Sequence, residues 1–169
     1  MDARRGKGAR VGVQTGLEAV TGYLERKGVS FEVVEHARTE SATAEARAVG
    51  LPPADVAKTV VLRDGVGLRL AVIPASHRLD LHKVRGVLGA SPRLRLVSEN
   101  EMAAEFDEFE VGALPPLAPL LDAVELMDER LLDHDRILFA GGDHEHGVLV
   151  DPRDLVQAAR ARVADLCED

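Results

Sequence analysis

The segment 55–76, DVAKTVVLRDGVGLRLAVIPAS, constrains the fold more than any other part of the chain. Two apolar runs rich in β-branched residues, 59–63 and 68–73, are joined by Asp64-Gly65-Val66-Gly67. This pattern predicts a β-hairpin in which the glycines supply the positive φ of a tight turn. We expect the hairpin to be the centre of the domain. Its first strand begins at a single lysine, Lys58.

Turn and cap signals divide the rest of the chain into short elements. We expect helices over 15–27, 41–49, 79–88, 98–106 and 151–166, strands over 29–35, 93–97, 123–127, 136–140 and 148–150, and a helical turn at 128–132. One glycine and three prolines make 110–119 a loop. Short strands linked by hairpins predict an α+β domain with a mixed, mostly antiparallel, barrel-like sheet surrounded by helices.

The length of 169 residues suits one domain. We assign it to residues 13–169 and interpret the basic segment 1–12 as a disordered arm. No run reaches the roughly 18 to 20 apolar residues of a membrane span, so we expect a cytoplasmic protein with no membrane contact. Cys167 is the single cysteine, which excludes an internal disulfide, and we expect it to be inert.

Charge is distributed unevenly along the chain, whose formal net charge is −8. The segment 58–95 holds eight Lys or Arg against two acids, whereas nineteen acids and five arginines follow from Glu99 onward. A basic face of this kind can hold a phosphate backbone despite a low pI. On charge alone, two solvated faces of opposite sign explain the pattern equally well.

Motifs for several common chemistries are missing from the sequence. Neither GxGxxG nor GxxxxGK[ST] occurs, so a dinucleotide or NTP phosphate cradle has no support. Ser76 lacks the GxSxG context of a nucleophile elbow. His144 and His146 would share a face of a strand, beside Asp143 and Glu145, but no second pair at metal-ligand spacing accompanies them. We therefore expect no metal.

Two features could carry chemistry, and each also has a structural explanation. Lys58 shares a strand face with Val60 and Leu62, so its ammonium either serves a cavity mouth or extends to water past apolar surface. The stretch 112–116, GALPP, either lets a ligand approach a rigid backbone closely or is a stiff connector.

Together these features resemble the YbaK/prolyl-tRNA editing family of aminoacyl-tRNA deacylases, over about residues 33–155. The matching motifs occur in the family's order: His36, VAKTVVL at 56–62, AVIPA at 71–75, LDLHK at 79–83, GALPP at 112–116, Asp128-Glu129, and AGG at 140–142. The resemblance implies that Lys58 is the catalytic residue. It further implies a substrate-binding set of His36, Thr59, Ser76, Gly112, Ala113, Pro115, Pro116, Gly141 and Gly142.

Members of that family hydrolyse the ester that joins a wrong amino acid to the tRNA 3′ end. The resemblance therefore implies trans-editing of a mischarged aminoacyl-tRNA carrying a small amino acid, with no metal or organic cofactor. The alternative is a module of the same fold that binds tRNA or an aminoacyl end without turnover. Partnership with an aminoacyl-tRNA synthetase, and the choice between monomer and homodimer, stay open. Leu117-Ala118 and Ala140 depart from the family pattern and leave amino-acid specificity undefined.

Overall fold

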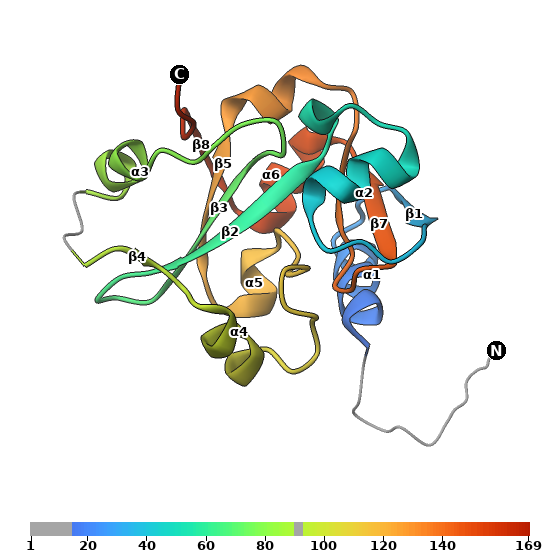
Figure 1. Ribbon diagram of the computed structural model, residues 1–169, viewed down its shortest axis with the longest axis horizontal. Coiled ribbons are helices and arrows are strands. Elements are labelled where there is room, and N and C mark those ends of the chain that lie inside the picture. The colour runs from blue at the N-terminus through green and yellow to red at the C-terminus, as the bar shows by residue number, and fades with distance from the viewer. Residues whose placement is uncertain (1–14, 90–92) are drawn as a thin grey trace.

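The computed structural model describes residues 15–89 and 93–169 (Figure 1). The predicted arm, residues 1–12, lies outside the described residues. Among the described residues, no helix is long and apolar enough to cross a membrane.

The strands form two sheets, as Figure 1 shows. The three-stranded sheet is antiparallel and has the order β1-β7-β6: β1 (Phe31–Glu35), β7 (His146–Val150) and β6 (Ile137–Ala140). The five-stranded sheet has the order β4-β2-β3-β5-β8: β4 (Arg95–Leu96), β2 (Ala57–Arg63), β3 (Leu68–Pro74), β5 (Val124–Asp128) and β8 (Arg162–Ala164). In this sheet β5 runs parallel to both neighbours, β3 and β8. The predicted α+β fold with mostly antiparallel pairing is confirmed, but the strands make two open sheets rather than a closed barrel.

The central hairpin is present, and its turn is built differently from the prediction. The strands β2 and β3 pair antiparallel from Ala57 opposite Pro74 to Arg63 opposite Leu68. Neither glycine of the turn has a positive φ. Instead, the Asp64 carboxylate accepts hydrogen bonds from the backbone N–H groups of Val66 (2.8 Å) and Gly67 (3.0 Å). A side-chain acceptor thus stabilises the turn that we had expected glycine conformation to make.

Most of the helices begin at residues whose side chains cap them. The helices are α1 (Gly16–Arg26), α2 (Ala42–Val49), α3 (Leu81–Leu88), α4 (Glu99–Glu105), α5 (Ala118–Leu121) and α6 (Pro152–Ala159), with two 3-10 turns, η1 (Pro53–Asp55) and η2 (Glu129–Asp133). Thr15 and Ser98 each form a complete capping box with the glutamate three residues later. Ser41 caps α2 and Asp80 caps α3. Local capping chemistry therefore sets where these helices start.

Several predicted boundaries differ from the structure by one or two residues, and two elements, β8 and α5, were not predicted. The C-terminal helix ends at Ala159, because Arg160 adopts a left-handed conformation (φ 55°) and the chain then forms β8 beside β5. The predicted loop 110–119 contains the start of α5 at Ala118. Pro119 fits there because the first turn of a helix has no intrahelical partner for its N–H groups.

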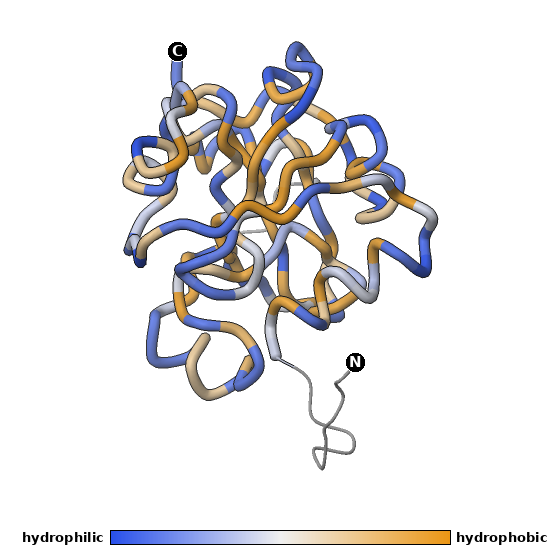
Figure 2. The backbone as a smooth tube through the Cα atoms, turned by 90° about the vertical axis from the view of Figure 1, so that its right-hand side faces the viewer, coloured by the Kyte–Doolittle hydropathy of each residue, from blue (hydrophilic) through white to orange (hydrophobic). Residues whose placement is uncertain are grey.

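Apolar residues cover both faces of the central hairpin, and Figure 2 shows hydrophobic strands in the middle with hydrophilic loops outside. Alternate residues of β3 belong to different clusters: Leu70 and Val72 pack into the larger one, and Ala71 and Ile73 into the other. The larger cluster includes Phe139 of β6, whereas the smaller one includes Val84 of α3. The hairpin is thus held rigidly between two layers.

Candidate active site

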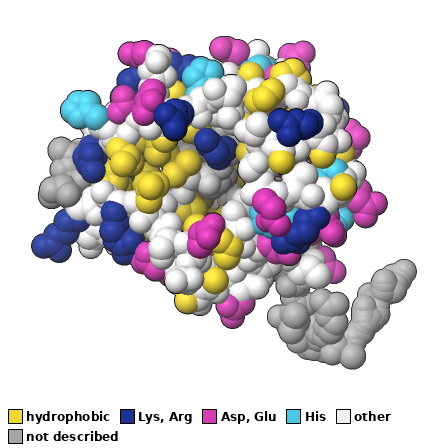
Figure 3. All heavy atoms as spheres, in the orientation of Figure 1, with side chains coloured by type: hydrophobic (Ala, Val, Ile, Leu, Met, Phe, Trp, Pro, Cys, Tyr) yellow, Lys and Arg dark blue, Asp and Glu magenta, His cyan; other side chains and the backbone are white. Residues whose placement is uncertain are grey.

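A cavity of about 340 Å³ lies beside β2, between this strand, α2 and the loops 110–117 and 141–145. Eighteen residues line it: Thr39, Glu40, Ser41, Ala42, Glu45, Ala57, Lys58, Thr59, Val60, Val61, Leu96, Val97, Met102, Gly112, Leu114, Ala140, Asp143 and His144. Figure 3 shows hydrophobic side chains gathered over β2 and β4, with Lys and Arg side chains at their edge. Acidic and histidine side chains lie across the hollow.

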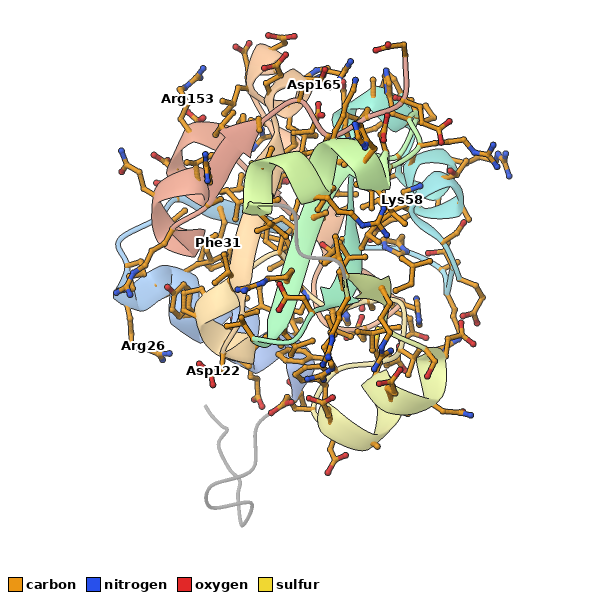
Figure 4. All side chains as sticks on the ribbon, turned by 90° about the vertical axis from the view of Figure 1, so that its left-hand side faces the viewer. Arg26, Phe31, Lys58, Asp122, Arg153 and Asp165 are labelled. Atoms are coloured by element: carbon orange, nitrogen blue, oxygen red, sulfur yellow. The ribbon has the colours of Figure 1, made fainter. Side chains whose placement is uncertain are left out.

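Lys58 is the second residue of β2 and lines the cavity. The side chain is half-buried, and its Nζ donates to the carbonyl oxygen of His77 at 3.4 Å. No described carboxylate forms an ion pair with it. Lys58 lies opposite Ile73 in the hairpin, so the two side chains share a face of the sheet, and Lys58 lines the cavity. Figure 4 shows Lys58 among the side chains between α3 and α2.

The backbone of β2 also faces the cavity, at Thr59. Backbone groups alternate between the two sides of a strand, and the Val61 carbonyl accepts from Val97 N on the side away from β3 (3.0 Å). Thr59 is two residues before Val61, so its N–H and C=O point to that same side. The strand β4 pairs only with the last two residues of β2, and an isolated bridge joins Val56 to Leu138 of β6, so Thr59 lies on this edge between the two neighbours. The cavity wall therefore offers one backbone donor and one acceptor beside Lys58.

Gly112 closes the opposite side of the cavity. It has a positive φ of 86°, and an added Cβ would lie 3.4 Å from Cε1 of His144. The His144 ring in turn holds the loop, since its Nε2 lies 2.7 Å from the carbonyl oxygen of Val111. A substituted residue here would be strained by this φ, while its Cβ would only touch the His144 ring, so the backbone conformation is what requires glycine.

A buried glutamate of α2 lines the cavity and is paired with a buried histidine outside the lining. His36 Nε2 is 2.9 Å from Oε2 of Glu45, and the two side chains are 3% and 5% exposed. His36 Nδ1 lies 2.7 Å from the carbonyl oxygen of Ala37, which fixes a proton on Nδ1. The contact between His36 and Glu45 therefore contains one shared proton.

The pKa values of this pair respond to burial and to the shared hydrogen bond. Burial by itself lowers the pKa of His36, but the bonds to Ala37 and Glu45 outweigh it and raise the pKa above its ordinary value. Burial raises the pKa of Glu45, and the bond from His36 opposes that rise. Both directions favour keeping the proton within the pair.

The structure brings some of the predicted site residues together and leaves others behind the wall. Lys58, Thr59 and Gly112 line the cavity. His36 is outside the lining but contacts Glu45, which lines the cavity. The Oγ of the exposed Ser76 lies 2.8 Å from Nδ1 of His77. The carbonyl oxygen of His77 accepts the hydrogen bond from Lys58. Five predicted residues are not in the lining: Ala113, Pro115, Pro116, Gly141 and Gly142.

Those five residues are buried and hold the loops that shape the cavity. The carbonyl of Gly142 accepts from Glu110 N at 2.9 Å. A Cβ at Gly142 would lie 2.7 Å from a backbone carbon of Gly16, so α1 begins in direct contact with this loop. Pro115 and Pro116 are buried and follow the Gly112 loop, where their fixed φ limits the conformations of this segment. Their positions suit support rather than contact with a ligand.

Sequence reasoning missed the acidic wall, which consists of Glu40, Glu45 and Asp143. A signal for Glu45 was present: it follows Ala42 by three residues and precedes Val49 by four, on the apolar stripe of α2. A glutamate on such a stripe is either paired or functional. Asp143 and Glu40 lie in loops, where sequence pattern does not show which way they point.

The side chains of His144 and His146 both form hydrogen bonds within the protein. His146 Nδ1 contacts both carboxylate oxygens of Asp143 at 2.9 Å, and His144 contacts Val111. Throughout residues 15–89 and 93–169, no group of three or more His, Cys, Asp or Glu side chains could hold a metal ion.

Comparison with solved structures finds several of the same fold. One, described as "a putative trans-editing enzyme for prolyl tRNA synthetase", is 30% identical over 93% of this chain and 99% of the other, with a TM-score of 0.82. A protein from a study of epitope grafting onto scaffold proteins by computational design is 28% identical, with a TM-score of 0.80 over the same shares of the two chains. A hypothetical protein is 26% identical over 88% and 99% of the two chains, with a TM-score of 0.79.

The family comparison gives the same answer from sequence. A model of the aminoacyl-tRNA editing domain matches residues 36–158. That span begins at His36 and contains every residue that lines the cavity. The chain therefore belongs to the aminoacyl-tRNA editing domain family.

Proposed function

We propose that the protein is a deacylase that hydrolyses the ester of a mischarged aminoacyl-tRNA carrying a small amino acid. The observation that carries this proposal is the cavity itself, in which Lys58, the open backbone edge at Thr59 and the Gly112 loop meet. Its volume of about 340 Å³ is at the lower end of the range for ligand sites. A small aminoacyl group fits this size better than a bulky one.

The reaction needs positioning and polarisation more than a strong base. Water attacks the carbonyl carbon of the ester, the bond from that carbon to the ribose oxygen breaks, and the proton released by the water passes to the leaving ribose oxygen. Negative charge develops on the carbonyl oxygen during the attack. Preorganised donors at that oxygen lower the barrier.

Lys58 and the Thr59 N–H are two donors that this site can supply. The ammonium of Lys58 is bonded to one carbonyl oxygen at 3.4 Å, a long contact that a ligand oxygen or phosphate can replace. The Thr59 N–H is fixed by the hairpin and needs no rearrangement before it donates. We assign Lys58 to the terminal phosphate or the ester carbonyl, and the Thr59 backbone to the aminoacyl group.

The first test is a panel of mischarged tRNAs with purified protein. One similar structure is described as "a putative trans-editing enzyme for prolyl tRNA synthetase". The first substrate to try is therefore the tRNA for proline, charged with alanine or another small amino acid. We expect release of the amino acid faster than in buffer. Lys58→Ala should reduce kcat/KM by about a hundredfold or more, the usual cost of losing a donor to a developing charge.

The matched control is Lys27→Ala, which removes an exposed lysine that lies over the Tyr23 ring and away from the cavity. It should leave the rate unchanged. If no pair in the panel is hydrolysed faster than in buffer, or if Lys58→Ala keeps full activity, the catalytic proposal is wrong. Saturable, salt-sensitive tRNA binding without hydrolysis would instead favour the non-catalytic binding module.

A further inference from the structure

The wall that faces Lys58 across the cavity is rich in hydrogen-bond acceptors. Glu45 is 3% exposed, lines the cavity and uses one carboxylate oxygen on His36. Its other oxygen, Oε1, has no partner among the described residues. Whichever way the proton shared with His36 lies, Oε1 carries none and accepts. A buried glutamate with one open oxygen at a cavity calls for a donor from a ligand.

Two further carboxylates extend this wall. Asp143 is half-buried and bonded to His146 and to the backbone N of Glu145, and Glu40 stands at the rim beside Arg38. The hydroxyls of Thr39 and Ser41 line the cavity on this side too and can donate, whereas the ring of His144 is engaged at Val111. Lys58, the cation that lines the cavity, lies on β2 and forms no ion pair with any of the three carboxylates within the described residues.

The two sides of the cavity therefore differ in charge: the β2 side carries a cation, and the α2 side carries carboxylate acceptors. The 3′ end of an aminoacyl-tRNA has the complementary arrangement. It carries a phosphate on the nucleotide side and, at the other end, an α-amino group that is cationic near or below neutral pH. An ammonium has three donors and no acceptor, which matches the three carboxylates of this wall.

We propose that the wall formed by Glu45, Asp143 and Glu40 binds the free α-ammonium of the aminoacyl group. This inference rests on the proposed function and narrows its substrate class. Esters whose amino group is acylated, such as formylated aminoacyl or peptidyl ends, present a neutral amide with one donor and added bulk. They leave the buried Glu45 oxygen poorly paired and are rejected.

The test compares two stable ligands that cannot be hydrolysed. Each is a 3′-amino-3′-deoxyadenosine 5′-phosphate that holds alanine through an amide in place of the ester, one with a free α-amine and one with an N-acetyl group. Binding is measured at about pH 6.5, below the ordinary pKa of an α-amino group. We expect the free amine to bind at least about tenfold more tightly, the free-energy difference of one charge-assisted hydrogen bond.

Variants assign the preference to the wall. Glu45→Gln and Asp143→Asn should each reduce the ratio of the two dissociation constants toward one, whereas Glu32→Gln, an exposed control on β1, should not change it. Should Glu45→Gln fail to fold, Asp143→Asn decides, because that side chain is half-buried in a loop. A ratio near one in the unaltered protein, or a ratio that neither variant changes, overturns the proposal.

The same comparison with alanyl-tRNA and N-acetylalanyl-tRNA separates this inference from the deacylase proposal. If both esters are hydrolysed with equal kcat/KM, deacylation stands and the ammonium wall is wrong. If the free amine analogue binds selectively but no ester is hydrolysed, the ammonium wall stands and deacylation is wrong.

Discussion

At the scale of single residues, Glu125 is an acid buried without a charged partner. It lies on β5 and is 1% exposed; Oε1 accepts from Ala118 N at 3.1 Å, and Oε2 has no partner in the described part of the chain. Burial raises the pKa of Glu125 well above its ordinary value, against the smaller effect of the bond from Ala118. The folded protein therefore holds this proton more tightly than the unfolded chain does.

The raised pKa of Glu125 predicts that the unfolding free energy depends on pH, and that Glu125→Gln removes this contribution. A raised folded pKa gives stability that is complete below the unfolded value of 4.5 and is lost as pH rises toward the folded pKa. The glutamine stays neutral and keeps the acceptor for Ala118, so at pH 8 it should raise the unfolding free energy by on the order of 1 kcal/mol. Urea titrations at several pH values would measure this. An unchanged slope with pH contradicts the account, and the exposed Glu129→Gln is the control.

Cys167 is expected to be unreactive in the folded protein. The residue is fully buried, and burial, reinforced by the neighbouring Asp128, raises the pKa of its thiol to about 12. Because the thiolate is the reactive form, an aromatic disulfide reagent at pH 8 should label Cys167 at the rate at which the protein unfolds. Labelling should become rapid in denaturant. Fast labelling of the folded protein would contradict this prediction.

At the scale of secondary-structure elements, the residue Asp165 ties three segments together after β8. Its carboxylate forms ion pairs with Nζ of Lys83 in α3 and with the guanidinium of Arg130 in η2, each at 2.9 Å. These bonds, first that from Lys83 and then that from Arg130, lower the pKa of Asp165 to about 2. Figure 4 shows Asp165 at the edge of the molecule where these segments meet.

Protonation of Asp165 at low pH should weaken its bonds to Lys83 and Arg130 and so destabilise the protein. A lowered folded pKa gives stability that is present above the unfolded value of 3.8 and is lost as pH falls through about 2. Asp165→Asn should therefore lower Tm at pH 7 and weaken the dependence of Tm on pH between those values. Part of that dependence should remain, because Arg95 lowers the pKa of Glu101 to about 2 as well. Calorimetry that finds an identical acid slope in the variant would contradict the assignment.

Most elements could be predicted because their signals are local. Caps such as Thr15 and Ser98 and the two apolar runs of the hairpin need no information from elsewhere in the chain. The strand β8 could not be predicted, since Val163 continues the helical spacing of α6 and its actual partner, β5, is more than thirty residues away. The turn after β2 was assigned to glycine φ, whereas the side chain of Asp64 makes it.

The candidate site was predictable only in part. Lys58 and Gly112 were found through motif resemblance, and they do line one cavity. The wall across from Lys58 was not found, because it combines the buried face of a helix with two loops. Which way Glu45 faces depends on the packing of α2 against His36, a contact between residues nine positions apart.

At the scale of the whole molecule, the basic segment 58–95 is less basic on the surface than its sequence suggests. Four of its eight cations form ion pairs with acids: Arg63 with Glu105, Arg69 with Asp64, Lys83 with Asp165 and Arg95 with Glu101. Lys58, Arg78, Arg85 and Arg93 have no acidic partner among the described residues. These four are the expected phosphate contacts, so tRNA binding should rely on few charges and depend moderately on salt.

The most direct measurement is the rate at which the protein releases alanine from mischarged tRNA, compared between the unaltered chain and Lys58→Ala under identical conditions. The account predicts hydrolysis well above the rate in buffer and a loss of about a hundredfold or more in kcat/KM in the variant, with Lys27→Ala unchanged. Equal rates for the unaltered protein and Lys58→Ala would contradict the claim that this lysine and its cavity are the site of deacylation.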